Sequence, residues 1–413
     1  MPFLLYDTAL FFLRIYLTFS SLYRKKSKEW LQGQKELLPT IQREQKDGLA
    51  TTIWIHVASL GEYEQVKPIL SSFKEGLKHS VVLTVFSPSA YAIIKKECMA
   101  DHIYYLPFDR KKNVEGFLSA IQPQLVLFVK YEFWFNYCLE IKERKIPFLS
   151  ISTRLHEKHF FTKWYAKPYR KVLSAFTHFF TQDQESKEIL SRLGFFNTTF
   201  SGDTRYDRVA DIVDSKKKVT IVEQFKKDAK LLVVGSSWHQ DIGVLLPYLK
   251  TLANNRKVII APHKVDAESI RQLQAQLTDV SYECYSTYQA KNTSVLIVDT
   301  IGLLSSIYQY ADIAYVGGAF KTGLHNILEP TAYGVPVVFG PHYQKYSEAK
   351  VHIHQGIAFS IHDSLEYMRL MTRFEENEGL LLDIKQKADY LMKQNRGATR
   401  LILNYLERLE IID

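Results

Sequence analysis

An acidic residue, Glu62, stands just after a run of residues with the composition of a buried strand. The run is Thr52–Ala58, and a tight Ser59-Leu60-Gly61 turn follows it. Apolar residues then recur at helical spacing, which predicts that Glu62 lies at a helix N-terminus. A carboxylate there can take a proton from a substrate hydroxyl, and the helix dipole should keep it ionised. The position alone is equally consistent with plain helix-end electrostatics, worth about 0.3–1 kcal/mol.

The clearest motif combines a glycine pair with a second glycine loop. Gly317-Gly318 ends one strand-like run, and Gly340-Pro341 ends the next. The first pair lets a phosphate or a sugar approach the backbone closely. Asn326 and Glu329 should lie on a short helix between the loops, where a carboxylate can accept both hydroxyls of a ribose. The Gly235-Ser236-Ser237-Trp238 turn is either a phosphate site or an ordinary capped turn.

Two series of β-rich runs alternate with helical patterns, which predicts two doubly wound parallel-sheet domains. The first series comprises residues 52–58, 80–86, 125–129, 147–152 and 178–181. The second series comprises residues 231–235, 257–261, 295–299, 313–317 and 336–339. We expect an N-terminal helix over residues 1–27, α/β domains over 28–210 and 211–375, and a helical tail over 376–413. Because ligands bind at the carboxyl ends of parallel strands, the active site should lie in a cleft between facing domains.

Together these segments resemble the GT-B glycosyltransferases, and specifically the family of 3-deoxy-D-manno-octulosonic acid (Kdo) transferases. The likeness extends from Trp54 to Pro341. Besides the glycine motif it is carried by Ala58-Ser59-Leu60-Gly61-Glu62, Glu132-Phe133-Trp134-Phe135-Asn136, Ser152-Thr153-Arg154-Leu155, Gly202-Asp203-Thr204-Arg205-Tyr206-Asp207, Ala261-Pro262-His263-Lys264 and Asp299-Thr300-Ile301-Gly302. The resemblance implies a Rossmann-like GT-B fold. It also implies an inverting enzyme that moves Kdo from CMP-Kdo to a lipid A precursor, lipid IVA, in lipopolysaccharide biosynthesis.

The resemblance also implies roles for individual residues. Glu62 aligns with the family's general base, and Glu132 and Arg205 align with residues thought to stabilise the transition state. The residues that align with segments holding CMP are Pro262, His263, Ile301, Gly302, Leu303, Asn326, Ile327, Leu328 and Glu329.

Two of these places depart from the family pattern. His263 stands where the family commonly has Arg, and Ile301-Gly302-Leu303 stands where it commonly has Met-Gly-Glu. We therefore expect the loop at 301–303 to contribute backbone contacts rather than a carboxylate.

The composition indicates an anionic partner and a reducing compartment. Lys and Arg number 53 against 44 Asp and Glu, a formal net charge of +9, which suits a nucleic acid, an anionic membrane or a phosphorylated substrate. Three distant cysteines, Cys98, Cys138 and Cys284, predict neither a disulfide framework nor a zinc site. No Asp-x-Asp pair occurs. We therefore expect no metal and no cofactor, because helix N-termini and basic side chains could stabilise a leaving group with a single phosphate.

The N-terminus is expected to contact a membrane. Residues 2–23 are apolar and aromatic, a basic run follows, and neither a basic leader nor a cleavage site for a secretory signal is present. Asp7, Arg14, Thr18 and Ser21 fall on one helical stripe. This pattern favours a helix lying in the interface over a spanning one, and the alternative is a helix packed on the protein's own core.

A second segment, Arg154 to Lys171, combines basic and aromatic residues. It suits anionic headgroups or the phosphates of a lipid acceptor, although a nucleic acid would use the same chemistry and a solvated helix face is the plain alternative. Beside the apolar N-terminus it favours lipid over nucleic acid. We thus expect an inner-membrane enzyme with its catalytic domains on the cytoplasmic side. The residues expected to contact acceptor or membrane are Arg154, Lys158, Lys163, Lys167 and Lys171.

Two other functions remain open at this point. Another GT-B lipid-linked sugar transferase or a nucleotide-sugar epimerase would use UDP-GlcNAc and select uridine. A membrane-bound sugar-nucleotide binding protein without catalysis would bind CMP and show no turnover.

Overall fold

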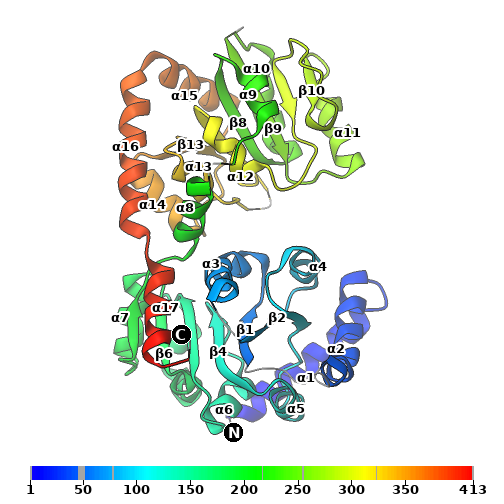
Figure 1. Cartoon of the computed structure of the whole chain (residues 1–413), viewed down its shortest axis with the longest axis vertical. Helices are drawn as coiled ribbons and strands as arrows, with labels where there is room; N and C mark the ends of the chain where they lie inside the picture. Colours follow the sequence, from blue (N-terminus) through cyan, green and yellow to red (C-terminus); the bar gives the residue numbers. More distant parts are fainter. Residues whose placement is uncertain are drawn as a thin grey trace. The chain divides into compact units, whose positions relative to one another are not determined.

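The computed structural model describes residues 2–44, 52–76, 79–215, 217–253, 255–321 and 323–411. The chain forms two α/β units (Figure 1). Unit 1 comprises Met1–Asp207 with Gly397–Asp413, and unit 2 comprises Arg208–Arg396. Each unit holds a seven-stranded sheet in which neighbouring strands are parallel. The two doubly wound sheets predicted from the alternating pattern are therefore present.

In unit 1 the strand order reverses between the two central strands, β1 (Thr52–Val57) and β4 (Pro123–Val129). Both are almost completely buried because helices cover both faces of the sheet. The order across the sheet is β3-β2-β1-β4-β5-β6-β7. The remaining strands are β2 (Ser80–Val85), β3 (His102–Tyr105), β5 (Phe148–Thr153), β6 (His178–Thr181) and β7 (Thr198–Phe200).

Two apolar cores lie on the two faces of this sheet. On one face Trp54 packs edge-to-face against Phe117 and Phe128. The helices of that face are α2 (Lys25–Glu44), α5 (Lys111–Ile121), α6 (Phe135–Glu143), η3 (Trp164–Ala175) and α7 (Gln184–Arg192). The helices of the other face are α3 (Leu60–Gly76), α4 (Pro88–Glu97) and α17 (Ala398–Arg408).

The N-terminal helix α1 (Pro2–Ser20) packs on unit 1 through part of its apolar surface. Leu10 is buried among side chains that include Trp30 and Phe108. The Tyr6 hydroxyl donates a hydrogen bond of 2.5 Å to Asp109. Packing on the protein's own core, an alternative that the sequence left open, therefore applies to this face of the helix. None of the described helices is both long and apolar enough to cross a membrane.

In unit 2 the strand order reverses between β8 (Lys230–Ser237) and β12 (Ile313–Val316). The order across the sheet is β10-β11-β9-β8-β12-β13-β14. The other strands are β9 (Arg256–Pro262), β10 (Tyr282–Cys284), β11 (Val295–Ile297), β13 (Val337–Phe339) and β14 (Ala358–Ser360). The longer helices are α8 (Arg205–Ser215), which begins in unit 1, α9 (Thr220–Lys226), α10 (His239–Lys250), α11 (Ala267–Gln276), α14 (Ser347–His354), α15 (Ser364–Glu376) and α16 (Glu378–Asn395).

The predicted tail over 376–413 is not one element in the structure. It is divided between α16, which belongs to unit 2, and α17, which belongs to unit 1. Gly397 separates the two helices with a φ of 104°, a conformation that glycine adopts without strain. The Asp207 carboxylate accepts hydrogen bonds from the backbone N–H groups of Gly397 and Thr399, at 2.6 and 2.7 Å. The boundary between the units also falls three residues before the predicted one at 210/211, and residues 1–27 belong to unit 1.

Candidate active site

Glu62 lies in the first turn of α3, at the carboxyl end of β1, as predicted. Only 7% of the residue is exposed, and its carboxylate accepts a hydrogen bond of 2.5 Å from the Ala58 N–H. Burial and then the charge of Glu132 raise the pKa of Glu62 to about 7, against the Ala58 hydrogen bond and the charges of Lys130 and His56. Burial therefore works against the ionised carboxylate that we expect at this helix N-terminus. A pKa near 7 suits a general base at neutral pH.

Glu132 follows β4, the strand beside β1 at the point where strand order reverses. Two donors converge on its Oε2 atom: Trp134 Nε1 at 2.5 Å and His56 Nε2 at 3.2 Å. His56 lies within β1 and is completely buried. The structure therefore brings Glu62 and Glu132 to the same edge of the sheet, at the topological switch point where doubly wound folds bind ligands.

Arg205 begins α8, and its guanidinium is held by a neighbouring carboxylate. Its Nε and Nη2 atoms donate to Asp203 at 3.0 and 2.6 Å, and Gln182 Nε2 donates to the same carboxylate at 2.7 Å. Burial tends to raise the pKa of Asp203, but the charge and hydrogen bonds of Arg205 outweigh it, so the pKa is lowered. The ion pair fixes the direction of a guanidinium whose side chain is 18% exposed.

The basic segment from Arg154 to Lys171 divides into two parts. Arg154 follows β5 and pairs with Asp183 at 3.4 Å. Because it directly follows β5, Arg154 lies at the carboxyl edge of the sheet. The four lysines lie further along, in a loop and the 3-10 helix η3 rather than on the regular helix face considered above. Lys158, Lys167 and Lys171 are exposed and Lys163 is half-buried.

In unit 2 three aromatic rings stack at the carboxyl ends of β8, β9 and β12. The His263 ring lies 4.5 Å from the Trp238 ring and 4.5 Å from the His325 ring. Trp238 Nε1 lies 3.2 Å from His325 Nε2 and donates to it. Burial, and then the neighbouring charge, lowers the pKa of both histidines, that of His325 to about 4. Both imidazoles are thus neutral at pH 7, which differs from the permanent charge of the Arg that the family commonly carries at position 263.

The motif from Asn326 to Glu329 forms a hydrogen-bonded corner at the start of α13 (Leu328–Ala332). Asn326 Oδ1 accepts from the Leu328 N–H at 3.0 Å, and Asn326 Nδ2 donates to Glu329 at 3.1 Å. Ser305 Oγ donates to the other Glu329 oxygen at 2.8 Å. Ile327 and Leu328 are buried in the core, so their side chains serve packing and leave only their backbone for contact with a nucleotide.

The loop at 301–303 has the form expected of a backbone contact. The Ile301 side chain is 87% exposed, and Gly302 has a φ of 88°. No carboxylate is present at these three positions.

The loops after β8 and β12 are held together by one buried carboxylate. Asp241 accepts from the Trp238 N–H at 2.8 Å and from the Gly318 N–H at 3.0 Å. A Cβ atom on Gly317 would lie 2.5 Å from the Ser236 carbonyl oxygen, so only glycine fits there. Residues 235–237 are the last residues of β8, and Trp238 is the N-cap of helix α10, so this segment is a capped strand-to-helix connection beside the glycine motif.

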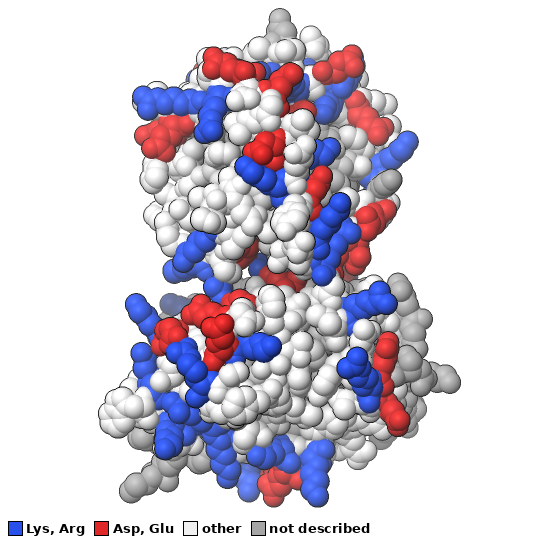
Figure 2. Space-filling view, turned by 90° about the vertical axis from the view of Figure 1, so that its left-hand side faces the viewer, with Lys and Arg blue, Asp and Glu red and all other residues white. Residues whose placement is uncertain are grey.

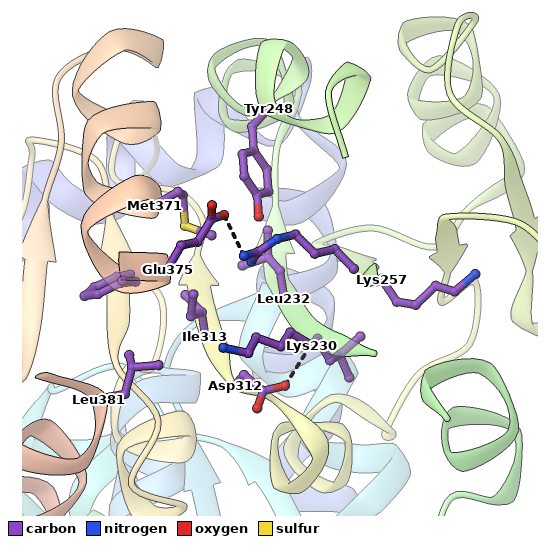
Figure 3. A pocket seen from close by; sticks show the side chains of 12 residues that line it. Lys230, Leu232, Tyr248, Lys257, Asp312, Ile313, Met371, Glu375 and Leu381 are labelled. Atoms are coloured by element: carbon purple, nitrogen blue, oxygen red, sulfur yellow. Dashed lines mark hydrogen bonds and ion pairs between the residues drawn. The ribbon is translucent and has the colours of Figure 1, made fainter. Parts of the chain in front are cut away.

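A depression at the opposite edge of the unit 2 sheet carries none of the predicted site residues (Figure 3). It lies where β8 and β9 begin, and its charged groups are paired. Arg256 contacts Glu375 at 3.0 Å, and Asp312 accepts from the Leu231 N–H at 2.7 Å. These pairs hold α15 and the start of the sheet together, so we assign this depression a structural role. The candidate site is therefore at the carboxyl edge of the sheet.

Sequence reasoning missed several residues of these sites. His56 was counted only as part of a buried strand, although a histidine inside an apolar run is itself a signal. Asp203, Trp238 and His325 were quoted within motifs and given no role of their own. Their importance depends on partners distant in the chain, such as the 87 residues that separate Trp238 from His325.

Comparison with known proteins finds similar chains among the Kdo transferases. The model of a family described as 3-deoxy-D-manno-octulosonic-acid transferase (kdotransferase) matches residues 29–208. The chain is similar to the 3-deoxy-D-manno-octulosonic acid transferase of Aquifex aeolicus, with 28% identity over 368 residues that cover 86% of this chain and 92% of the relative. It is also similar to the transferase of that name from Haemophilus influenzae, with 25% identity and coverage of 86% and 87%.

The fold is shared more widely. The UDP-GlcNAc 2-epimerase from Neisseria meningitidis, solved bound to UDP-GlcNAc, matches with a TM-score of 0.60 and 14% identity over 87% of this chain and 100% of that one. At this identity the likeness concerns the fold alone. The sequence matches, which run through both units, show that this chain is similar to the Kdo transferases.

Proposed function

We propose that this protein transfers Kdo from CMP-Kdo to a sugar hydroxyl of a lipid A precursor, with inversion at the anomeric carbon. The observation that carries the proposal is the pair of carboxylates at the unit 1 switch point. Glu62 is buried with a pKa of about 7, and Glu132 follows the neighbouring strand and has two hydrogen-bond donors on one oxygen.

In the proposed reaction Glu62 accepts the proton of the acceptor hydroxyl as that oxygen attacks the anomeric carbon of Kdo. The bond from the anomeric carbon to the CMP phosphate oxygen breaks, and CMP leaves with the bonding electrons. Positive charge develops on the sugar ring, as in other glycosyl transfers, and the Glu132 carboxylate stabilises it. Arg205, fixed by Asp203, supplies positive charge for the anionic donor.

Unit 2 supplies the groups for the nucleotide. The corner formed by Ser305, Asn326 and Glu329 offers a carboxylate and an amide to the ribose hydroxyls. His263 and the backbone at Gly302 lie in loops that align with the family's CMP segments, and Trp238 and His325 stack on the two sides of the neutral His263 ring. We expect the stack to bind by ring contact and hydrogen bonding, since it lacks a permanent charge.

We propose further that unit 1 docks on the anionic cytoplasmic surface of the inner membrane. The exposed surface of α1 carries an apolar part beside the polar stripe of Asp7, Arg14 and Thr18: Phe11, Phe12 and Phe19 are 53%, 63% and 65% exposed. An amphipathic helix of this kind inserts its apolar face at the headgroup level. In the basic segment Trp164 is 86% exposed, which suits the same interface.

Ring contacts support a single docking surface formed by both segments. Tyr6 of α1 packs on Phe135 with ring centroids 4.3 Å apart, Phe135 on Tyr169 at 5.7 Å, and Tyr169 on Phe160 at 5.3 Å. This row of rings connects α1 to the basic segment across one side of unit 1. Lys and Arg side chains gather along an edge of unit 1 in Figure 2, which favours anionic lipid.

The deciding experiment supplies the purified protein with a tetra-acylated lipid A precursor and either CMP-Kdo or UDP-GlcNAc. We expect CMP release and a lipid heavier by one or more Kdo residues, measured by mass spectrometry, when CMP-Kdo is the donor and not when UDP-GlcNAc is. Conversion of UDP-GlcNAc would support the epimerase or GlcNAc-transferase alternative. Tight CMP binding without any lipid product would support a non-catalytic binding protein.

A further inference from the structure

A buried row of hydrogen bonds runs from the core of unit 1 to Glu132. Trp54 Nε1 donates to Thr84 Oγ1 at 2.8 Å, and Thr84 Oγ1 lies 2.9 Å from His56 Nδ1. His56 Nε2 lies 3.2 Å from Glu132 Oε2. Trp54, Thr84 and His56 are each completely buried, so no water competes for these groups.

The direction of each hydrogen bond follows from its donor. The indole of Trp54 can only donate, so Thr84 Oγ1 accepts this hydrogen bond. The proton of the Thr84 hydroxyl is then free to point to another acceptor. Its nearest further acceptor is His56 Nδ1 at 2.9 Å, whereas the Ile55 carbonyl lies at 3.5 Å. A hydroxyl proton directed at Nδ1 requires an unprotonated Nδ1. The single N–H of the neutral ring is then at Nε2, which faces a carboxylate that can only accept.

We infer that His56 is a positioning residue for Glu132, and that the Trp54–Thr84 pair holds its imidazole in the Nε2–H tautomer. His56 and Trp134 both donate to Oε2, and Oε1 of Glu132 accepts no hydrogen bond from the described part of the chain. The two donors therefore fix the carboxylate plane and leave one oxygen for the substrate. The catalytic part of this inference rests on the proposed function, while the tautomer does not.

The opposite tautomer would be unfavourable at this position. A proton on Nδ1 could reach the Thr84 carbonyl oxygen at 3.1 Å, but the Nε2 lone pair would then face Glu132 at 3.2 Å. Two acceptors in contact in a buried site repel each other, and Glu132 would lose one of the two donors, His56 and Trp134, that hold its carboxylate. The Thr84 hydroxyl is thus what selects the useful tautomer.

Four variants separate this role from simple packing. His56→Gln keeps an N–H donor, and His56→Leu removes it at similar volume. Thr84→Ser keeps the hydroxyl, and Thr84→Val removes it at similar volume. We expect kcat to fall by about 10–100-fold in His56→Leu and about 3–10-fold in Thr84→Val, the ranges for hydrogen bonds to charged and neutral groups. His56→Gln and Thr84→Ser should stay within about threefold of the parent, and CMP affinity, a property of unit 2, should be unchanged in all four.

The tautomer is measured directly in the parent protein by nitrogen-15 NMR of labelled histidine, with the His56 signals assigned by their loss in His56→Gln. We expect a protonated Nε2 and an unprotonated Nδ1. A proton on Nδ1, in either the other tautomer or the imidazolium, would overturn the inference. Equal kcat values for His56→Leu and His56→Gln would overturn the positioning role. If the parent transfers no Kdo, the proposed function fails, while the NMR result still decides the tautomer and shows whether Glu132 has its donor.

Discussion

Glu62 and Glu132 follow adjacent central strands, β1 and β4, on the two sides of the point where the strand order of unit 1 reverses. Burial, and next the charge of Glu132, raises the pKa of Glu62 to about 7. Glu132 keeps two hydrogen-bond donors on one oxygen. These different environments suit the different roles proposed for the two carboxylates, Glu62 as the base and Glu132 as the group that stabilises the developing charge.

Replacement of Glu62 by Gln should abolish most turnover. The amide keeps the size and the hydrogen bond from Ala58 but cannot accept a proton, so kcat should fall by about 10²–10⁴-fold. CMP release from CMP-Kdo in the presence of the lipid acceptor measures this. CMP affinity should be unchanged, because the nucleotide residues lie in unit 2. Near-parental turnover in the folded variant would refute both the base and the location of the acceptor site.

The activity should rise with pH through the pKa of Glu62. Below about pH 7 the carboxyl group is protonated and cannot serve as a base, whereas above it the carboxylate is available. The pKa of His325 is lowered to about 4 and that of His263 is also lowered, so neither should add an inflection near pH 7. A profile of kcat/KM from pH 5.5 to 8.5 checks this. A flat profile would contradict the assignment.

The same pKa shift predicts that the folded protein loses stability over the pH range in which its activity rises. Because burial raises the pKa of Glu62 from 4.5 to about 7, the folded protein is relatively stabilised below pH 4.5, and that stabilisation is lost as the pH rises through 7. Glu62→Gln should therefore be more stable than the parent at pH 8, by about 1–3 kcal/mol, and nearly equal to it at pH 4.5. Urea unfolding at the two pH values measures the difference. If the free energies of unfolding of the variant and the parent differ by the same amount at both pH values, the charge of Glu62 does not affect stability.

Loss of the Glu329 carboxylate should weaken CMP binding. Glu329→Ala removes a charged partner for the ribose and should raise the Kd for CMP by about 10–100-fold, or 1–3 kcal/mol. Ser305→Ala should have a smaller effect, since Ser305 only orients the carboxylate. Asp383→Ala, which removes an exposed acid on α16, is the matched control. Calorimetric titration gives each Kd, and an unchanged Kd for Glu329→Ala would exclude the ribose contact.

Vesicle binding should depend on the exposed face of α1 and on the basic segment. A variant with Phe11, Phe12 and Phe19 all replaced by Ser should co-sediment less with phosphatidylglycerol vesicles. Phe196→Ser, which removes a 79% exposed ring elsewhere in unit 1, should bind them like the parent. A second variant should also bind less: it has Gln in place of Lys158, Lys163, Lys167 and Lys171. The difference in binding between this variant and the parent should shrink in 0.5 M salt, because salt screens the charges. The matched control is Gln at four exposed lysines of unit 2, namely Lys217, Lys218, Lys291 and Lys393. Equal binding by all variants would refute the docking surface.

The sequence by itself determined the strands that are buried on both faces. Each of the ten runs predicted as strands overlaps one in the structure, because central parallel strands such as Thr52–Val57 are continuous apolar segments. The four strands that were not predicted, β3, β7, β10 and β14, are the edges of the two sheets. An edge strand such as Thr198–Phe200 is short and only partly buried, so its residues show no clear apolar pattern.

The motifs likewise placed Glu62, Glu132, Arg205 and Glu329 in the connections that follow strands, on the side where parallel sheets bind ligands. Only the tertiary structure decided how those groups are held. The pKa of Glu62 depends on burial beneath distant segments, and the orientation of Glu132 depends on His56, 76 residues earlier in the chain. The helical pattern after residue 376 is continuous in the sequence, yet its two halves belong to different units because Asp207 caps α17 from 190 residues away. Periodicity reports which face of an element is buried, whereas hydrogen-bond partners and desolvation are properties of the assembled core.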